Sequence, residues 1–94
     1  MNYKLSKEAE ADLIRIYQYG VRNYGLLRAD RYYDVFIVRF EEIAKNPYLY
    51  QAADYIHQGY RRCVCGVDSI FYRVVDDKVE IISILGRQDT KEIF

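Results

Sequence analysis

One stretch near the end of the chain, residues 60–85, constrains the fold most. It reads YRRCVCGVDSIFYRVVDDKVEIISIL, is rich in β-branched and aromatic residues, and contains no proline. Breaks at residues 66–68 and at Asp76 and Asp77 interrupt it. We therefore predict three consecutive strands, at residues 60–65, 69–75 and 79–85.

The turn at Asp76 and Asp77 predicts how the last two strands pair. Asp tolerates turn conformations because its side chain can hydrogen-bond to nearby backbone groups. A two-residue loop pairs Val75 with Lys78 and brings Arg73 opposite Glu80, an opposite-charge pair that favours this register.

The same register assigns side chains to the two faces of the sheet. One face is apolar, with Ile70, Tyr72, Val74, Val79 and Ile81. The other face carries the Arg73–Glu80 pair together with three apolar residues, Phe71, Ile82 and Ile84. Phe71 pairs with Ile82 in this register. An uncovered face of an antiparallel sheet is normally polar. These three apolar residues therefore indicate that the chain's own tail or a partner covers this face.

The first half of the chain predicts a short strand and two helices. The strand is Asn2–Leu5, and Ser6 is the predicted N-cap of a first helix that stops at Gly25. Gly20 lies within the apolar stripe of this helix, where it costs about 1 kcal/mol relative to Ala, so we expect another element to approach closely there. The second helix is predicted at residues 28–45.

The order of elements predicts the fold class. It is strand, helix, helix, strand, strand, strand, with residues 48–59 as a loop, in one domain of residues 1–94. The predicted architecture is α+β, a helical hairpin packed on one face of a small, mainly antiparallel sheet.

Two valines of the second predicted helix lie off its apolar face. Val35 and Val38 are three residues apart and adjoin each other among charged side chains. Scattered surface aliphatics are common, and a partner-binding edge has the same pattern, so both interpretations stay open.

The charge balance excludes a basic nucleic-acid-binding arm. Fourteen basic and fourteen acidic residues cancel, so electrostatics gives no reason to expect direct nucleic-acid binding. No signal peptide opens the chain, and no apolar run approaches the roughly 18 residues of a membrane span. We expect a cytoplasmic protein without a membrane segment.

Few residues suggest catalysis or metal binding. The chain has no Gly-rich phosphate loop, nucleophile elbow or metal-binding helix motif, and His57 is its single histidine. Cys63 and Cys65 are two apart in a predicted strand, so they share a face, and we predict reduced thiols rather than a disulfide. No metal or other cofactor is predicted.

Arginines are the remaining candidates for a site. Arg61, Arg73 and Arg87 belong to the predicted sheet or its exit. A guanidinium group can hold a phosphate or a carboxylate through two parallel hydrogen bonds, but Arg73 can equally pair with Glu80. Without a proton-transfer partner, the arginines favour binding over catalysis.

Several segments together resemble the ParE toxins of the ParE/RelE superfamily of bacterial toxin–antitoxin modules. They are YKLSKEAEADLIRIYQYGVRNYG at the start, GYRR and IFYRVVDDKVEIISIL in the centre, and GRQD at the exit. The resemblance implies a type II toxin that inhibits DNA gyrase, and so DNA replication, and that a ParD-like antitoxin neutralises. The alternative is a RelE-type ribosome-dependent mRNA endoribonuclease.

The resemblance also bears on the site residues. Arg61 and Arg87 match the family's sheet and sheet-exit arginines, whereas the tail lacks the His or Tyr of the ribonucleases, which favours a binding toxin over an enzyme. The residues predicted to bind the target are Arg61, Arg73 and Arg87. The residues predicted to bind the antitoxin are Val35, Val38, Phe71, Ile82 and Ile84.

Overall fold

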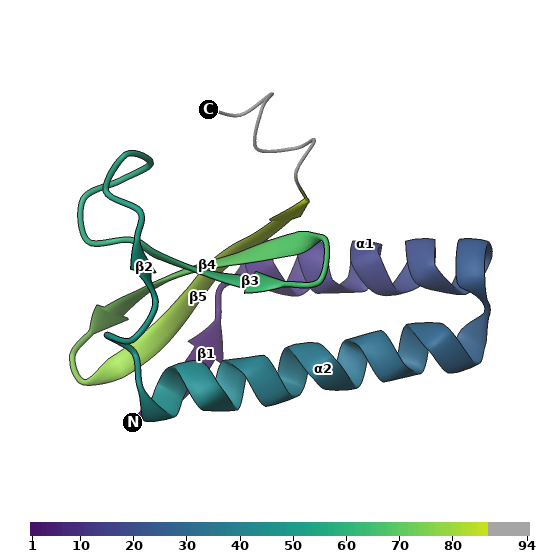
Figure 1. Cartoon of the computed structure of the whole chain (residues 1–94), viewed down its shortest axis with the longest axis horizontal. Helices are drawn as coiled ribbons and strands as arrows, with labels where there is room; N and C mark the ends of the chain where they lie inside the picture. The colour runs from purple at the N-terminus through teal and green to yellow at the C-terminus, as the bar shows by residue number, and fades with distance from the viewer. Residues whose placement is uncertain (87–94) are drawn as a thin grey trace.

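A computed structural model describes residues 1–86, which form two helices on one face of a five-stranded sheet (Figure 1). This confirms the predicted α+β class with a helical hairpin on a mainly antiparallel sheet. The elements are β1 (Asn2–Leu5), α1 (Lys7–Tyr24), α2 (Leu26–Lys45), β2 (Gln51–Ala52), β3 (Arg61–Cys65), β4 (Asp68–Val75) and β5 (Lys78–Gly86).

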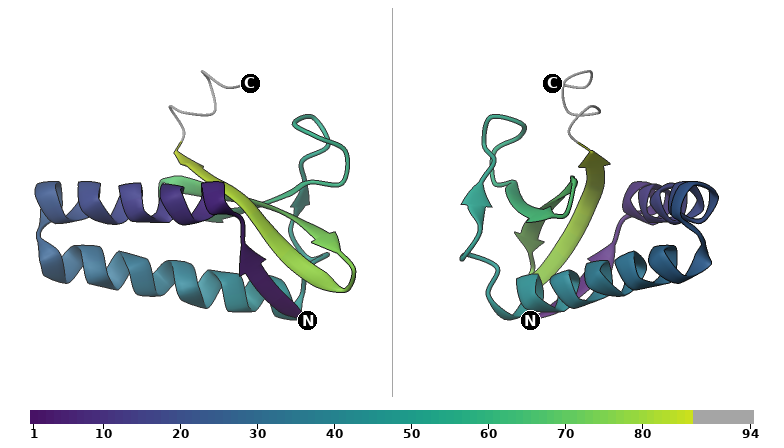
Figure 2. Two further views of the ribbon diagram at one scale, coloured as in Figure 1. Left: turned by 180° about the vertical axis from the view of Figure 1, so that it is seen from behind. Right: turned by 45° about the vertical axis from the view of Figure 1, so that its right-hand side comes forward.

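The strands lie in the order β1-β5-β4-β3-β2. β1 pairs in parallel with β5, and the other neighbours are antiparallel. The first and last strands therefore lie side by side (Figure 2). β2 was not predicted, because two residues, Gln51 and Ala52, are too few to give a periodic signal; they pair with the start of β3.

Local signals set the ends of the helices. Ser6 caps α1, because its Oγ accepts a hydrogen bond from the Ala9 N–H at 3.0 Å. Gly25, at φ 89°, is the one residue between the helices. α2 begins at Leu26, two residues earlier than predicted. A Cβ on Gly20 would lie 3.3 Å from Ala29 Cβ, which confirms the expected close approach of another element.

The predicted turn between β4 and β5 is confirmed. Asp76 and Asp77 have φ values of 50° and 60°, typical of a tight hairpin turn, and Val75 pairs with Lys78. Arg73 Nε donates to Glu80 Oε1 at 2.8 Å across the strands.

Beyond Tyr72 the register differs from the prediction. Tyr72 pairs with Ile81, but Phe71 pairs with Ser83, so Ile82 is the extra residue of a β-bulge. After a one-residue bulge, each residue points to the face opposite to the one that the unbulged register assigns. Ile84 is consequently fully buried on the helical side of the sheet, and its predicted place on the outer face is wrong.

Side chains of the N-cap Ser6 and of Asp12 in α1 hold the bulged part of β5. β1 pairs with β5 only as far as Ile81. Beyond that point, Ser6 Oγ donates to the Ile82 carbonyl at 2.8 Å, and the Ile84 N–H donates to Asp12 Oδ2 at 2.9 Å. These contacts satisfy backbone groups that a free sheet edge would expose.

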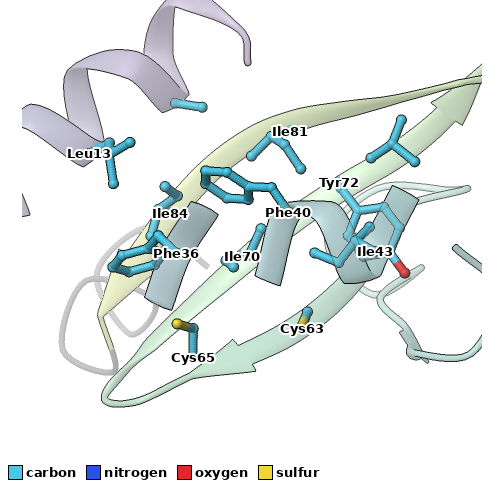
Figure 3. Close-up of a cluster of buried hydrophobic side chains, with 12 residues drawn as sticks. Leu13, Phe36, Phe40, Ile43, Cys63, Cys65, Ile70, Tyr72, Ile81 and Ile84 are labelled. Atoms are coloured by element: carbon cyan, nitrogen blue, oxygen red, sulfur yellow. The ribbon is translucent and has the colours of Figure 1, made fainter. Parts of the chain in front are cut away.

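The main core lies between the helical hairpin and the sheet (Figure 3). A second cluster lies on the opposite face of the sheet, where Phe71 and Leu85 contact Ala53, with Ile56 and Tyr60 beside them. The segment between β2 and β3 thus contributes to covering the face on which Phe71 was predicted. Within residues 1–86, neither helix is long and apolar enough to cross a bilayer.

Candidate partner-binding surfaces

A groove of about 770 Å³ lies along the helical hairpin, next to the turn between β3 and β4. The helices extend beyond the end of the sheet, so their far ends have no strand beneath them (Figure 1). Apolar groups of both helices line the groove, among them Leu13, Ile16, Ala29 and Phe36. The exposed arginines that line it are Arg15, Arg28 and Arg31.

One wall of the groove is fixed by Tyr32. Its hydroxyl donates to the Cys65 carbonyl and to Asp68 Oδ2, both at 2.8 Å. Burial and the bond to Asp68 raise the pKa of Tyr32, so the hydroxyl stays protonated at neutral pH. A Cβ on Gly66 would lie 2.6 Å from this hydroxyl. The turn therefore fits closely over the Tyr32 ring.

Aromatic contacts order the far ends of the helices. Tyr17 Oη donates to Asp30 Oδ1 at 2.5 Å, and the Tyr17 ring meets the Tyr33 ring edge-on. The bond to Asp30 raises the pKa of Tyr17. The Arg28 guanidinium lies over the Tyr24 ring, 5.2 Å from its centre. These contacts between α1 and α2 help to hold the groove open without a covering strand.

The sheet arginines make contacts within the chain. Arg61 Nη1 donates to the Tyr50 carbonyl at 2.8 Å, and its guanidinium lies over the Tyr48 ring. Arg61 faces Tyr72 directly across the strands, so the two share a face, whereas Arg73 follows Tyr72 and points to the other face. Arg61 and Arg73 therefore do not form one cluster, and Arg87 lies outside the described residues.

The two cysteines and the single histidine are placed in a way that favours a structural role over a catalytic one. Cys63 and Cys65 are free, buried thiols, as predicted, and burial raises the pKa of Cys65 to about 11. A protonated thiol is a poor nucleophile at neutral pH. His57 is exposed and stacks on Tyr60, with ring centres 4.8 Å apart. Among residues 1–86 there is no group of His, Cys, Asp and Glu side chains that could hold a metal ion.

The sequence matches a family model described as the ParE toxin of the type II toxin–antitoxin system parDE, over residues 3–90. The chain belongs to this family. It is 39% identical over 83 residues to Toxin ParE1 of Caulobacter vibrioides, covering 88% of this chain and 85% of the relative. It is 30% identical over 87 residues to Toxin ParE1 of Mycobacterium tuberculosis, covering 92% and 89%.

Solved structures share the fold of this ParE family member. A chain of the chromosomal ParDE system from P. aeruginosa superposes with a TM-score of 0.81 at 20% identity, covering 92% of this chain and 95% of that one. A chain of the YoeB–YefM complex from Staphylococcus aureus gives 0.60 at 18% identity, covering 90% and 94%. At these identities the likeness shows the RelE-like fold alone.

The residues predicted to bind an antitoxin separate into two groups in this ParE toxin. Val35 and Val38 are 43% and 50% exposed on α2, and Val35 also lines the groove. Ile82 is half-buried. Phe71 and Ile84 are buried, Phe71 on the predicted outer face and Ile84 in the main core, so they offer no surface to a partner in this structure.

The sequence prediction missed the groove of this ParE toxin. The signal was present, because Gly20 and Tyr24 continue the apolar stripe of α1 that begins at Ala9. The sequence does not show, however, that the sheet ends before the helices do. That difference leaves the far part of the stripe uncovered.

Proposed function

We propose that this ParE-family toxin acts in the cytoplasm by inhibiting DNA gyrase, and that a ParD-like antitoxin neutralises it. The observation that carries this proposal is the 39% identity to a protein named Toxin ParE1, over most of both chains. The finer assignment to gyrase follows from the family resemblance, which favours a binding toxin.

The tail after β5 lacks His and Tyr, which favours binding over RNA cleavage, and the hydroxyls of the half-buried Tyr32 and the buried Tyr72 are engaged within the fold. Tyr72 donates to the Pro47 carbonyl at 2.6 Å, and Tyr32 donates to Cys65 and Asp68. Burial raises the pKa of both hydroxyls, and both are engaged in hydrogen bonds within the fold. A RelE-type ribonuclease is the competing outcome of the test below.

For the antitoxin, we propose contacts at the exposed Val35–Val38 edge of α2, continuing into the groove and including the half-buried Ile82. For the target, we propose Arg87 and Arg73 as contacts. Arg61 takes a supporting role, because its guanidinium already holds the segment that follows α2.

The purified protein should be tested in a gyrase supercoiling assay and, in parallel, in a ribosome-dependent mRNA cleavage assay. We expect loss of supercoiling with intact mRNA, and filamentous growth of cells that express the toxin. Cuts in mRNA at codon positions with full gyrase activity would establish the ribonuclease instead. Arg87→Ala should weaken the inhibition, whereas Arg22→Ala, at an exposed arginine of α1, should not.

The antitoxin contact has its own test. Val35→Asp should weaken binding of the co-expressed antitoxin in calorimetry, because the substitution places a charge in an apolar contact. Ile14→Asp is the control, since Ile14 is exposed on α1 and does not line the groove. Circular dichroism checks that both variants fold. Equal antitoxin affinity for Val35→Asp and the unmodified toxin would remove this edge from the proposal.

A further inference from the structure

The last strand of the sheet leads to the mouth of the groove. Arg15, which lines the groove, donates from Nη2 to the Ile84 carbonyl of β5 at 3.4 Å. Gly86, the last residue of β5, pairs with Asp68, which also lines the groove. The chain that follows Gly86 therefore starts beside the groove.

This following part of the chain, residues 87–94, is called the exit segment; it reads RQDTKEIF and lies outside the described residues. Eight residues span about 12 Å as a helix and about 26 Å when extended. The lining of the groove runs from Leu13 to Tyr24 along α1, which is roughly 16 Å. The last residues of the exit segment can therefore reach the middle of the groove in either conformation.

The charges of the groove and of the exit segment complement each other. Arg28 and Arg31 are exposed, one helical turn apart on α2. Among the described residues that line the groove, Asp68 is the one acidic residue, and it is buried. The exit segment supplies two carboxylates, Asp89 and Glu92. Each can lie near an arginine of the groove, where opposite charges attract.

The apolar residues also match. Ile93 and Phe94 are the apolar residues of the exit segment, and the groove lining between the helices includes Ile16 and Ala29. A short tether raises the effective concentration of a linked group to roughly the millimolar range. Contacts too weak to hold a free peptide can therefore hold a segment that is attached at Gly86.

We propose that the exit segment folds back into the groove in the free protein, with Ile93 and Phe94 on the groove floor and the two carboxylates beside Arg28 and Arg31. This occupancy needs no partner, so it stands apart from the proposed target. A partner that uses the groove must first displace the segment. Its apparent affinity is then reduced by the fraction of the protein in which the groove is open.

The outer face of the sheet is the competing place for the exit segment. Its apolar residues there are Phe71 and Leu85, which contact Ala53 and are 2% and 7% exposed. The groove, at about 770 Å³, offers more open apolar surface. The groove of a second copy of the chain is the other competing place.

A spin label on the exit segment distinguishes these places in the complete protein. The label is attached at Thr90→Cys, since Thr90 has no part in the proposed contacts, and the native thiols of Cys63 and Cys65 are buried. Nuclear magnetic resonance then measures which methyl groups the nitroxide broadens. We expect broadening at Ala29 in the groove and none at Ile56, which packs on the outer face.

Two sets of variants test the contacts themselves. Either R28E/R31E or I93D/F94D in the labelled protein should reduce the broadening at Ala29 severalfold, because the first repels the carboxylates and the second removes the apolar contact. High salt should weaken the charge contribution. Arg22→Glu is the control, because Arg22 is exposed on α1 and does not line the groove; it should change nothing. Thermal unfolding confirms that each variant is folded.

The inference is overturned if Ile56 is broadened instead of Ala29, if neither is broadened, or if R28E/R31E leaves the broadening of Ala29 unchanged. A mixture of spin-labelled protein with isotope-labelled, unmodified protein tests the second copy. Broadening of Ala29 in that mixture would overturn the placement within one chain.

The gyrase assay keeps this inference separate from the proposed function. A protein that inhibits gyrase while its exit segment lies outside the groove contradicts the inference alone. A protein whose exit segment occupies the groove but that leaves gyrase active contradicts the proposed target alone.

Discussion

The two halves of the helical hairpin carry one continuous apolar stripe but have different surroundings. In the near half, residues 7–16 and 34–45, the stripe lies on the sheet and includes Leu13, Phe36 and Phe40 of the main core. In the far half, residues 17–24 and 26–33, Tyr24 and Leu27 are exposed. The stripe thus stabilises the fold at one end and lies beyond the sheet at the other.

The difference shows that an amphipathic helix pattern does not determine which element covers its apolar face. Apolar burial contributes about 25 cal/mol per Å² of area removed from water, so the near half supplies much of the stability of the fold. The far half depends on Gly25, the Gly20–Ala29 contact and the Tyr17–Asp30 hydrogen bond for its order. Its apolar side chains Tyr24, Leu26 and Leu27 stay exposed in the isolated chain.

The largest expected loss of stability is for Leu13→Ala in the near half, compared with the same Leu→Ala change at Leu27 in the far half. Leu13 is 6% exposed and Leu27 is 65% exposed. Leu13→Ala should lower the free energy of unfolding by about 2–5 kcal/mol, because it opens a cavity in the main core. Urea denaturation measures this value. A loss for Leu13→Ala as small as that for Leu27→Ala would show that the near half is not the stabilising half.

An intermediate effect is expected at the boundary between the halves, where Gly66 lies against Tyr32. Gly66→Ala should cost about 1–3 kcal/mol, because φ is 59° and the new Cβ would contact the Tyr32 hydroxyl. Gly59→Ala is the control, since φ is 87° and no atom lies within 4 Å of its Cβ. Thermal unfolding should rank Gly66→Ala as the less stable variant; the reverse order would mean that the contact with Tyr32 is not restrictive.

The pH dependence of stability tests whether water reaches the buried Cys65 thiol in the core beneath the near half. Burial raises the pKa of Cys65 from 9.0 to about 11. In the unfolded chain the thiol ionises first, so the stability that Cys65 contributes is present below about pH 9 and is lost as the pH rises toward about 11. Urea denaturation of the unmodified protein should show a steeper fall over this range than that of Cys65→Ala. Parallel pH profiles would indicate that water reaches the thiol.

The smallest expected effect lies at the tip of the far half. Leu27→Ala should change the free energy of unfolding by less than about 0.5 kcal/mol, because the side chain is exposed and its loss leaves no cavity. The same urea series measures it beside Leu13→Ala. A loss above about 1 kcal/mol would show that the far half is covered within the isolated protein, for example by self-association.

Much of the fold follows from short-range chemistry that the sequence states directly. Ser6 can cap α1, Gly25 supplies the positive φ between the helices, and Asp76 and Asp77 form the two-residue turn, each through its own side chain or backbone freedom. The opposite charges of Arg73 and Glu80 then select the register next to that turn. These features required no knowledge of distant residues; the Ser6 cap, the helix end at Gly25, the Asp76–Asp77 turn and the Arg73–Glu80 register were predicted.

The sites depended more on tertiary structure. Residues 81–85 read IISIL, which has no glycine or turn residue to mark the bulge at Ile82. The bulge coincides with the Ser6 hydrogen bond to the Ile82 carbonyl, from a residue 76 positions earlier in the chain. It moves Ile84 into the main core, so an antitoxin contact predicted from strand alternation is buried.

By itself, the sequence determined which segments are helical and which extended, apart from the two-residue β2, because capping, turn chemistry and apolar periodicity act over a few residues. Tertiary structure decided which apolar residues stay exposed. Phe71 is covered by the segment between β2 and β3, while the far part of the helical stripe is left open because the sheet ends first. Exposure depends on the relative lengths and packing of elements far apart in the chain, which no local pattern encodes.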